Sequence, residues 1–166
     1  MNLKHGALTA ALLAVVTAAT PAMADWTVRE GKDDFGRPNG ELTLYSDFVL
    51  PRKHTLRYPF NNKLGSVSIF SKCQDILIYL DVPSGSIESK DIPYLVDGRE
   101  YSVISDIGHM ASRFIEPPHI EEFIRTLLAG EKSLEIALDA STYGKPHFTW
   151  SLKGFKEGLA KVCPDF

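Results

Sequence analysis

The chain has 166 residues, of which 44% are hydrophobic and 23% are charged, and its formal net charge is −3. This length fits one domain, and this composition excludes a disordered tail, a coiled coil and a fibrous repeat. Binding of nucleic acid would need a dense basic surface, which a mildly acidic chain does not offer. The sequence therefore predicts a single globular domain that does not bind nucleic acid, and it contains no motif that identifies an activity.

Residues 1–24 have the three parts of a secretory signal peptide. Lys4 and His5 form a basic start, an apolar run follows over residues 7–16, and Ala22-Met23-Ala24 supplies small residues before a cleavage site. The apolar run is short for a permanent membrane span, although an uncleaved anchor is the alternative. We therefore expect a protein exported to the periplasm or secreted, with residues 25–166 as its single mature domain and no integral membrane segment after cleavage.

Export would place the two cysteines, Cys73 and Cys163, in an oxidising compartment. Two cysteines allow one pairing, and the bridge would close a loop of about 90 residues. Neither cysteine lies in a Cys-x-x-Cys or Cys-x-x-His pattern, which argues against a metal site or a cysteine nucleophile. The sequence thus predicts a structural disulfide between them.

The first half of the mature chain predicts short strands. Residues 26–28 and 42–45 are two candidate strands, separated by a turn-rich loop over residues 31–40. Residues 67–73 alternate with a period of two, which predicts a strand with Cys73 on its inward face. Residues 76–82 are apolar on both faces, as is typical of a central strand that is covered on both sides.

The clearest local signal in the chain is a β-hairpin. Apolar residues alternate over residues 92–96 and again over residues 101–103, on either side of Asp97-Gly98. This dipeptide favours a type I′ turn, because both central residues of such a turn need a positive φ angle.

Two helices and two further strands are expected after the hairpin. A helix begins at Pro117 and has an apolar stripe up to Leu128, with Gly130 as a left-handed terminator. Residues 134–138 and 148–152 alternate as strands, and residues 155–163 form a closing helix with Cys163 on its buried stripe. The predicted fold is α+β, a mostly antiparallel β-sheet or sandwich with two short helices and one disulfide.

Catalytic and metal-binding patterns are not found among the candidate residues. No two histidines have the spacing of a zinc protease, and Gly-x-Ser-x-Gly does not occur. The pair Asp33-Asp34 lacks the ligand spacing of a calcium loop. We therefore predict no catalytic residue, no metal site and no cofactor. The histidines of the mature chain are His54, His109, His119 and His147.

The densest basic cluster lies between the second and third predicted strands. It consists of Arg52, Lys53, His54 and Arg57. These side chains are candidates for binding an anionic partner, and a solvated loop is the alternative.

The stretch from Val67 to Cys163 resembles the VasI family of small exported proteins associated with type VI secretion. The resemblance implies a periplasmic accessory protein that contacts other proteins and is not an enzyme. Trp26, soon after the signal segment, is similar to a tryptophan of invasion-associated-locus-B-like proteins, which implies the same kind of role. The VasI-like features are the strand before Cys73, the apolar strand 76–80, the Asp97-Gly98 hairpin, the helix 123–128, and the closing segment 148–155 with Cys163.

Two functions follow from these observations. The first is a non-catalytic accessory or binding protein with an envelope protein as its partner. The second is a cell-envelope hydrolase with a dispersed active site. A concave pocket with two convergent titratable side chains would favour the hydrolase. A flat or convex surface with an apolar patch would favour the binding protein.

Overall fold

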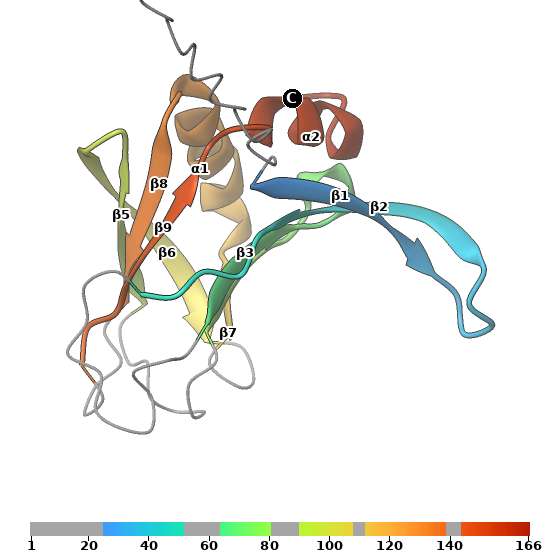
Figure 1. Ribbon diagram of the computed structural model, residues 1–166, viewed down its shortest axis with the longest axis horizontal. Coiled ribbons are helices and arrows are strands. Elements are labelled where there is room, and N and C mark those ends of the chain that lie inside the picture. Colours follow the sequence, from blue (N-terminus) through green and yellow to red (C-terminus); the bar gives the residue numbers. More distant parts are fainter. Residues whose placement is uncertain (1–24, 52–63, 81–89, 108–111, 139–143) are drawn as a thin grey trace, which may run out of the picture.

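The computed structural model describes residues 25–51, 64–80, 90–107, 112–138 and 144–166. These residues form a nine-stranded antiparallel sheet, two α-helices and a short 3-10 turn (Figure 1). The predicted α+β class is therefore confirmed. Strands of this sheet are ordered β1-β2-β3-β4-β7-β6-β5-β8-β9.

The elements follow one another along the chain with these bounds. The strands are β1 (Trp26–Lys32), β2 (Pro38–Ser46), β3 (Gly65–Ile69), β4 (Ile76–Leu80), β5 (Asp91–Val96), β6 (Arg99–Ile107), β7 (Ser112–Ile115), β8 (Ser133–Ala137) and β9 (His147–Ser151). The helices are α1 (Pro117–Ala129) and α2 (Phe155–Val162), and the 3-10 turn η1 spans Ser71–Cys73.

Two tryptophans show that the sheet curls until its first and last strands approach each other. Trp26 in β1 donates a hydrogen bond from its indole Nε1 to the carbonyl oxygen of Ser151 in β9, at 2.8 Å. Trp150 in β9 donates in the same way to the carbonyl oxygen of Asp47, just after β2, at 3.0 Å. Each indole N–H therefore satisfies a backbone carbonyl while its ring fills the interior of the curled sheet.

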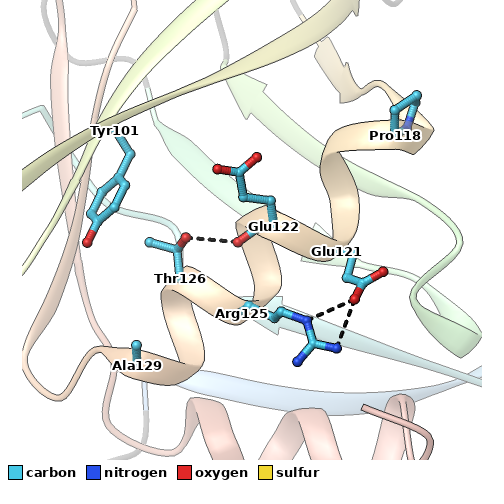
Figure 2. A pocket seen from close by; sticks show the side chains of 7 residues that line it. All are labelled: Tyr101, Pro118, Glu121, Glu122, Arg125, Thr126 and Ala129. Carbon is cyan, nitrogen blue, oxygen red and sulfur yellow. Dashed lines mark hydrogen bonds and ion pairs between the residues drawn. The ribbon is translucent and has the colours of Figure 1, made fainter.

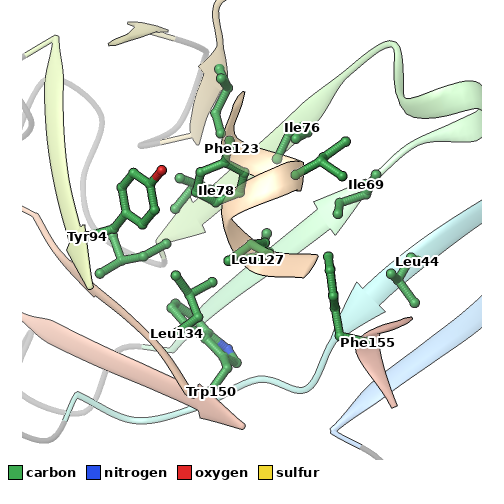
Figure 3. Packing of buried hydrophobic residues seen from close by; sticks show 14 of the residues in the cluster. Leu44, Ile69, Ile76, Ile78, Tyr94, Phe123, Leu127, Leu134, Trp150 and Phe155 are labelled. Atoms are coloured by element: carbon green, nitrogen blue, oxygen red, sulfur yellow. The ribbon is translucent and has the colours of Figure 1, made fainter. Parts of the chain in front are cut away.

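Helix α1 supplies the centre of the hydrophobic core. Its apolar stripe faces the interior of the curled sheet, and Leu127 lies between Leu134, Trp150 and Phe155 (Figure 3). Helix α2 packs on the first two strands, with the ring of Phe155 at 4.9 Å from that of Trp26. The buried residues of α1 are Ile120, Phe123, Ile124 and Leu127.

The turn of the predicted hairpin has the expected backbone angles, whereas the glycine at the end of α1 does not. Asp97 and Gly98 have φ angles of 52° and 81°, as the type I′ turn requires. Gly130 ends α1 as expected, but its φ angle of −79° is not left-handed. The role of this glycine is close packing instead, because an added Cβ would lie 2.4 Å from Val96 and 2.6 Å from Leu152.

Two predicted segments have different boundaries in the structure. The turn-rich loop expected over residues 31–40 is only the short turn between Lys32 and Pro38, because β1 and β2 pair up to that point. The strand expected over residues 67–73 ends at Ile69. Cys73 is buried as predicted, but it lies in η1, where the φ angles of Lys72 and Cys73 are 60° and 54°.

The predicted disulfide is confirmed. Cys73 and Cys163 are bonded, with 90 residues of sequence separation and a distance of 5.6 Å between their Cα atoms. Both are buried, and the bond ties η1 to the residue that follows α2.

Substitution of Gly65 by alanine is expected to destabilise the fold. An added Cβ would lie 2.7 Å from the ring of Phe148, which is itself fully buried, so β3 and β9 could not remain this close. Overpacking of this kind typically costs about 1–3 kcal/mol of unfolding free energy. Chemical denaturation of Gly65→Ala beside the exposed control Ser102→Ala measures the effect. Equal midpoints for Gly65→Ala and the wild type would contradict it.

Candidate functional site

An open groove of about 500 Å³ lies along the solvent side of α1, next to β6 (Figure 2). The apolar stripe of α1 faces the core, so the helix presents its polar residues to this groove. Strand β6 contributes one aromatic ring. The lining residues are Tyr101, Pro118, Glu121, Glu122, Arg125, Thr126 and Ala129.

The aromatic wall of the groove is held by the core. The ring of Tyr101 stacks on the ring of Tyr94 at 5.4 Å between centroids, with an interplanar angle of 23°. Tyr94 is buried, and its ring also meets Phe123 of α1 edge-on at 5.0 Å. Burial raises the pKa of the Tyr94 hydroxyl, which therefore stays protonated at neutral pH. The half-buried Tyr101 ring is the face that the groove offers to a ligand.

The two adjacent carboxylates of the groove have different surroundings. Glu121 accepts two hydrogen bonds from Arg125, from Nε at 2.9 Å and from Nη2 at 2.8 Å. Glu122 has no ion-pair partner in the described part of the chain, and its side chain points in a different direction from that of Glu121 (Figure 2). The two acids therefore do not converge on one point, and Glu122 alone adds a negative charge beside the aromatic wall.

A smaller hollow of about 230 Å³ continues the groove toward the turn of the β5–β6 hairpin. Asp97 forms its wall and accepts three backbone hydrogen bonds, from the N–H groups of Glu131 at 2.8 Å, Lys132 at 2.9 Å and Ser133 at 2.8 Å. The bond from Glu131 contributes most to lowering the pKa of the Asp97 carboxyl. Asp97 therefore fixes the chain that leaves α1, a role that its prediction as a turn residue did not include.

Asp97→Asn is expected to lower stability at neutral pH, because the two carboxylate oxygens share these three bonds. The amide has one oxygen, which accepts more weakly than a carboxylate does, and an NH2 group that cannot accept. A lowered pKa means that the carboxylate stabilises the fold above the usual aspartate pKa of about 3.9, and that this contribution is lost as the pH falls through the folded-state value. The difference in melting temperature between wild type and Asp97→Asn should therefore shrink below pH 4. A difference that is constant from pH 7 to pH 3, or equal to that of the exposed control Asp34→Asn, would contradict this role.

The structure describes only some of the other candidate residues from the sequence. The basic cluster of Arg52, Lys53, His54 and Arg57 lies outside the described residues, as do His109 and the signal segment. His147 Nδ1 lies 3.2 Å from Glu135 Oε1 on β8 and β9, away from the groove. Within the described ranges, no three of the histidine, cysteine, aspartate and glutamate residues are grouped so that they could hold a metal ion.

The residues of the groove were not predicted as a site. The signal for them is weak, because charged residues on the polar face of an amphipathic helix are the usual solvated surface. Only the fold places Tyr101 beside them. In the part of the chain that the structure describes, no helix has both the length and the apolar character needed to cross a membrane.

No protein-family model, curated protein or solved structure matches this chain. The resemblance to the VasI family therefore stays a prediction, and the candidate site rests on the geometry of the groove.

Proposed function

We propose that the protein is an exported, non-catalytic accessory protein that binds a protein partner in the periplasm, in the manner that the VasI resemblance implies. The observation that carries the proposal is the groove on α1, which is open and has an aromatic wall. Its ionisable side chains are either paired, as in Glu121 and Arg125, or turned apart. Such a surface fits recognition of a protein segment better than acid–base chemistry, which needs groups that meet at one reacting atom.

The groove favours a partner segment with a basic side chain. The Glu122 carboxylate lies on the same groove as the Tyr101 ring, and a lysine or arginine placed there would meet a negative charge and an aromatic face together. Pro118 and Ala129 add small uncharged side chains to the groove lining, which suits the backbone on either side of that basic residue.

Site-specific photo-crosslinking in the producing cells tests this site. A photoreactive residue at Ala129, in the groove, is compared with the same residue at Ala160, an exposed alanine on α2. We expect a discrete adduct with another exported protein at position 129 and none at position 160. Equal labelling at both positions, or an adduct at position 129 only with a second copy of the chain, would contradict the proposal.

The captured protein, once purified, allows the charge to be tested. Glu122→Lys should weaken its binding at least tenfold, while Glu157→Lys on the exposed side of α2 should leave binding unchanged. Mass spectrometry of the same exported material should show Asp25 as the first residue. An intact Met1, or turnover of a peptidoglycan or ester substrate by the purified protein, would be evidence for a different function.

A further inference from the structure

A second surface gathers exposed apolar side chains on the outer face of the sheet, away from the groove. In the described part of the chain, four of the six exposed large hydrophobic residues lie on it, and Phe48 is 61% exposed. We name this surface the outer-face patch. It consists of Phe48, Leu50, Leu64, Leu77, Tyr79 and Phe114.

The strand register shows that one side of the patch is continuous. Val49 pairs with Gly65, and Val49 packs toward the core, so Phe48 and Leu50 on either side of it face outward. Leu64 flanks Gly65 in the same way and lies opposite Leu50. The ring of Phe48 then meets the ring of Tyr79 in β4 edge-on, at 6.4 Å between centroids.

The other side of the patch continues across β4 and β7. Leu77 follows the same outward alternation as Tyr79, since Ile76 and Ile78 are buried in the core. Leu77 pairs directly with Phe114, which is 39% exposed. The apolar side chains thus extend from the segment after β2 to β7, with Ser66 and Ser68 of β3 buried between them on the same face.

The described residues cover the patch only in part. The run of residues 76–82 is apolar on both faces, which predicts a strand covered on both sides, yet Leu77 and Tyr79 are only half-buried. The exposed parts of Phe48 and Phe114 alone amount to roughly 200 Å² if a whole aromatic side chain offers about 200 Å². With the two leucines, the patch has the size of those that often mark interaction sites on monomers.

Among the described residues, charges border the patch but do not enter it. One row of paired residues crosses five neighbouring strands, with β4 in the middle. It consists of Tyr45, Ser68, Leu77, Phe114 and Asp106. At one end of this row Arg29 lies over the ring of Tyr45, 5.3 Å from its centroid. The other end is the carboxylate of Asp106, whose contact with Lys90 is long, at 3.6 Å, and exposed.

We propose that a second copy of this chain covers the outer-face patch, sheet against sheet, about a two-fold axis that runs along β4. An uncharged apolar centre can face itself without repulsion between like charges. The two-fold axis brings the Arg29 border of each copy over the Asp106 border of the other, so the pattern of charges on one face is complementary to itself. A typical stable interface buries about 800 Å² on each partner, so the patch would form the apolar centre and these charged borders the rim.

Sedimentation equilibrium of the exported, oxidised protein tests the proposal. We expect a monomer–dimer equilibrium in the micromolar range, and at least a tenfold weaker association for Phe48→Ser combined with Phe114→Ser. The matched control is Phe35→Ser, which removes an aromatic side chain that is 83% exposed but lies in the β1–β2 turn, outside the patch. Circular dichroism of each variant checks that the fold is retained, as the exposure of these side chains leads us to expect.

The charged borders give an independent test of the two-fold arrangement. Arg29→Glu and Asp106→Arg should each weaken the dimer, and the two changes together should restore it, because they exchange the two borders. A protein that remains monomeric at 0.5 mM (a test concentration chosen far above the expected range), or a dimer that Phe35→Ser weakens more than the patch variant does, would overturn the proposal. Because no residue that lines the groove belongs to the patch or to its charged borders, this result is independent of the crosslinking at Ala129.

Discussion

Reduction of the Cys73–Cys163 disulfide is expected to destabilise the protein strongly, and by more than Gly65→Ala or Asp97→Asn does. The bond closes a loop with a sequence separation of 90 residues, and opening such a loop releases conformational entropy in the unfolded chain. The chain-entropy model gives about 4–5 kcal/mol for a loop of this length, and structure that remains in the unfolded state reduces this value. The fold itself gives a second reason, since the bond holds the end of α2 against η1, and α2 packs on β1 and β2.

Urea denaturation measures the effect on three proteins. They are the oxidised protein, the reduced protein, and a double variant that carries both Cys73→Ser and Cys163→Ser. The reduced protein and the double variant should have similar, lower midpoints. Adding reductant to the double variant should change nothing, which controls for effects of the reductant itself. Free thiols that titrate in the native exported protein, or equal midpoints with and without reductant, would contradict the prediction.

Local sequence patterns predicted most of the strands and both helices. Each of these elements has one covered face, so its buried residues recur with the period of a strand or of a helix. The hairpin around Asp97-Gly98 is the clearest example, since turn chemistry and alternation indicate the same register. The stripe of α1 is another, because its buried residues are those predicted from the helical period.

Strand β7 was missed for a physical reason that the structure makes visible. It has only four residues, and Arg113, on its inward face, is fully buried where alternation requires an apolar side chain. Its guanidinium nitrogens have no hydrogen-bond partner in the described residues, and this burial lowers the pKa of Arg113. A charged residue at an inward position breaks the alternation of apolar and polar residues, so a strand of this kind cannot be predicted from that alternation.

The groove and the outer-face patch could not be predicted from local sequence patterns, because each depends on which elements become neighbours in the fold. Strand β4 pairs with β7, which lies more than thirty residues further along the chain, and this pairing places Phe114 beside Leu77. In the same way, the curl of the sheet around α1 places Tyr101 next to Glu122 and Thr126. The sequence predicted a strand with two covered faces at residues 76–82, whereas Leu77 and Tyr79 on the outer face of β4 are half-buried.

Leu159→Ala is expected to lower the unfolding free energy by about 2–5 kcal/mol, the usual cost of truncating a fully buried leucine. Leu159 is 2% exposed and lies on the face of α2 that packs against the first strands of the sheet. The exposed control Lys156→Ala, on the same helix, should change stability by only a few tenths of a kcal/mol.

The neighbouring disulfide makes this prediction sharper. The N–H of Cys163 donates to the carbonyl oxygen of Leu159 at 2.7 Å, so the leucine and the bond hold the same turn of α2. Changes at two sites in contact are not additive. If α2 is held both by its packing and by the bond, Leu159→Ala should cost less in the reduced protein, where the helix end is already free to move away, than in the oxidised protein. A denaturation midpoint that Leu159→Ala leaves unchanged in the oxidised protein would mean that the apolar face of α2 is not buried in solution, and that face would then be available for docking.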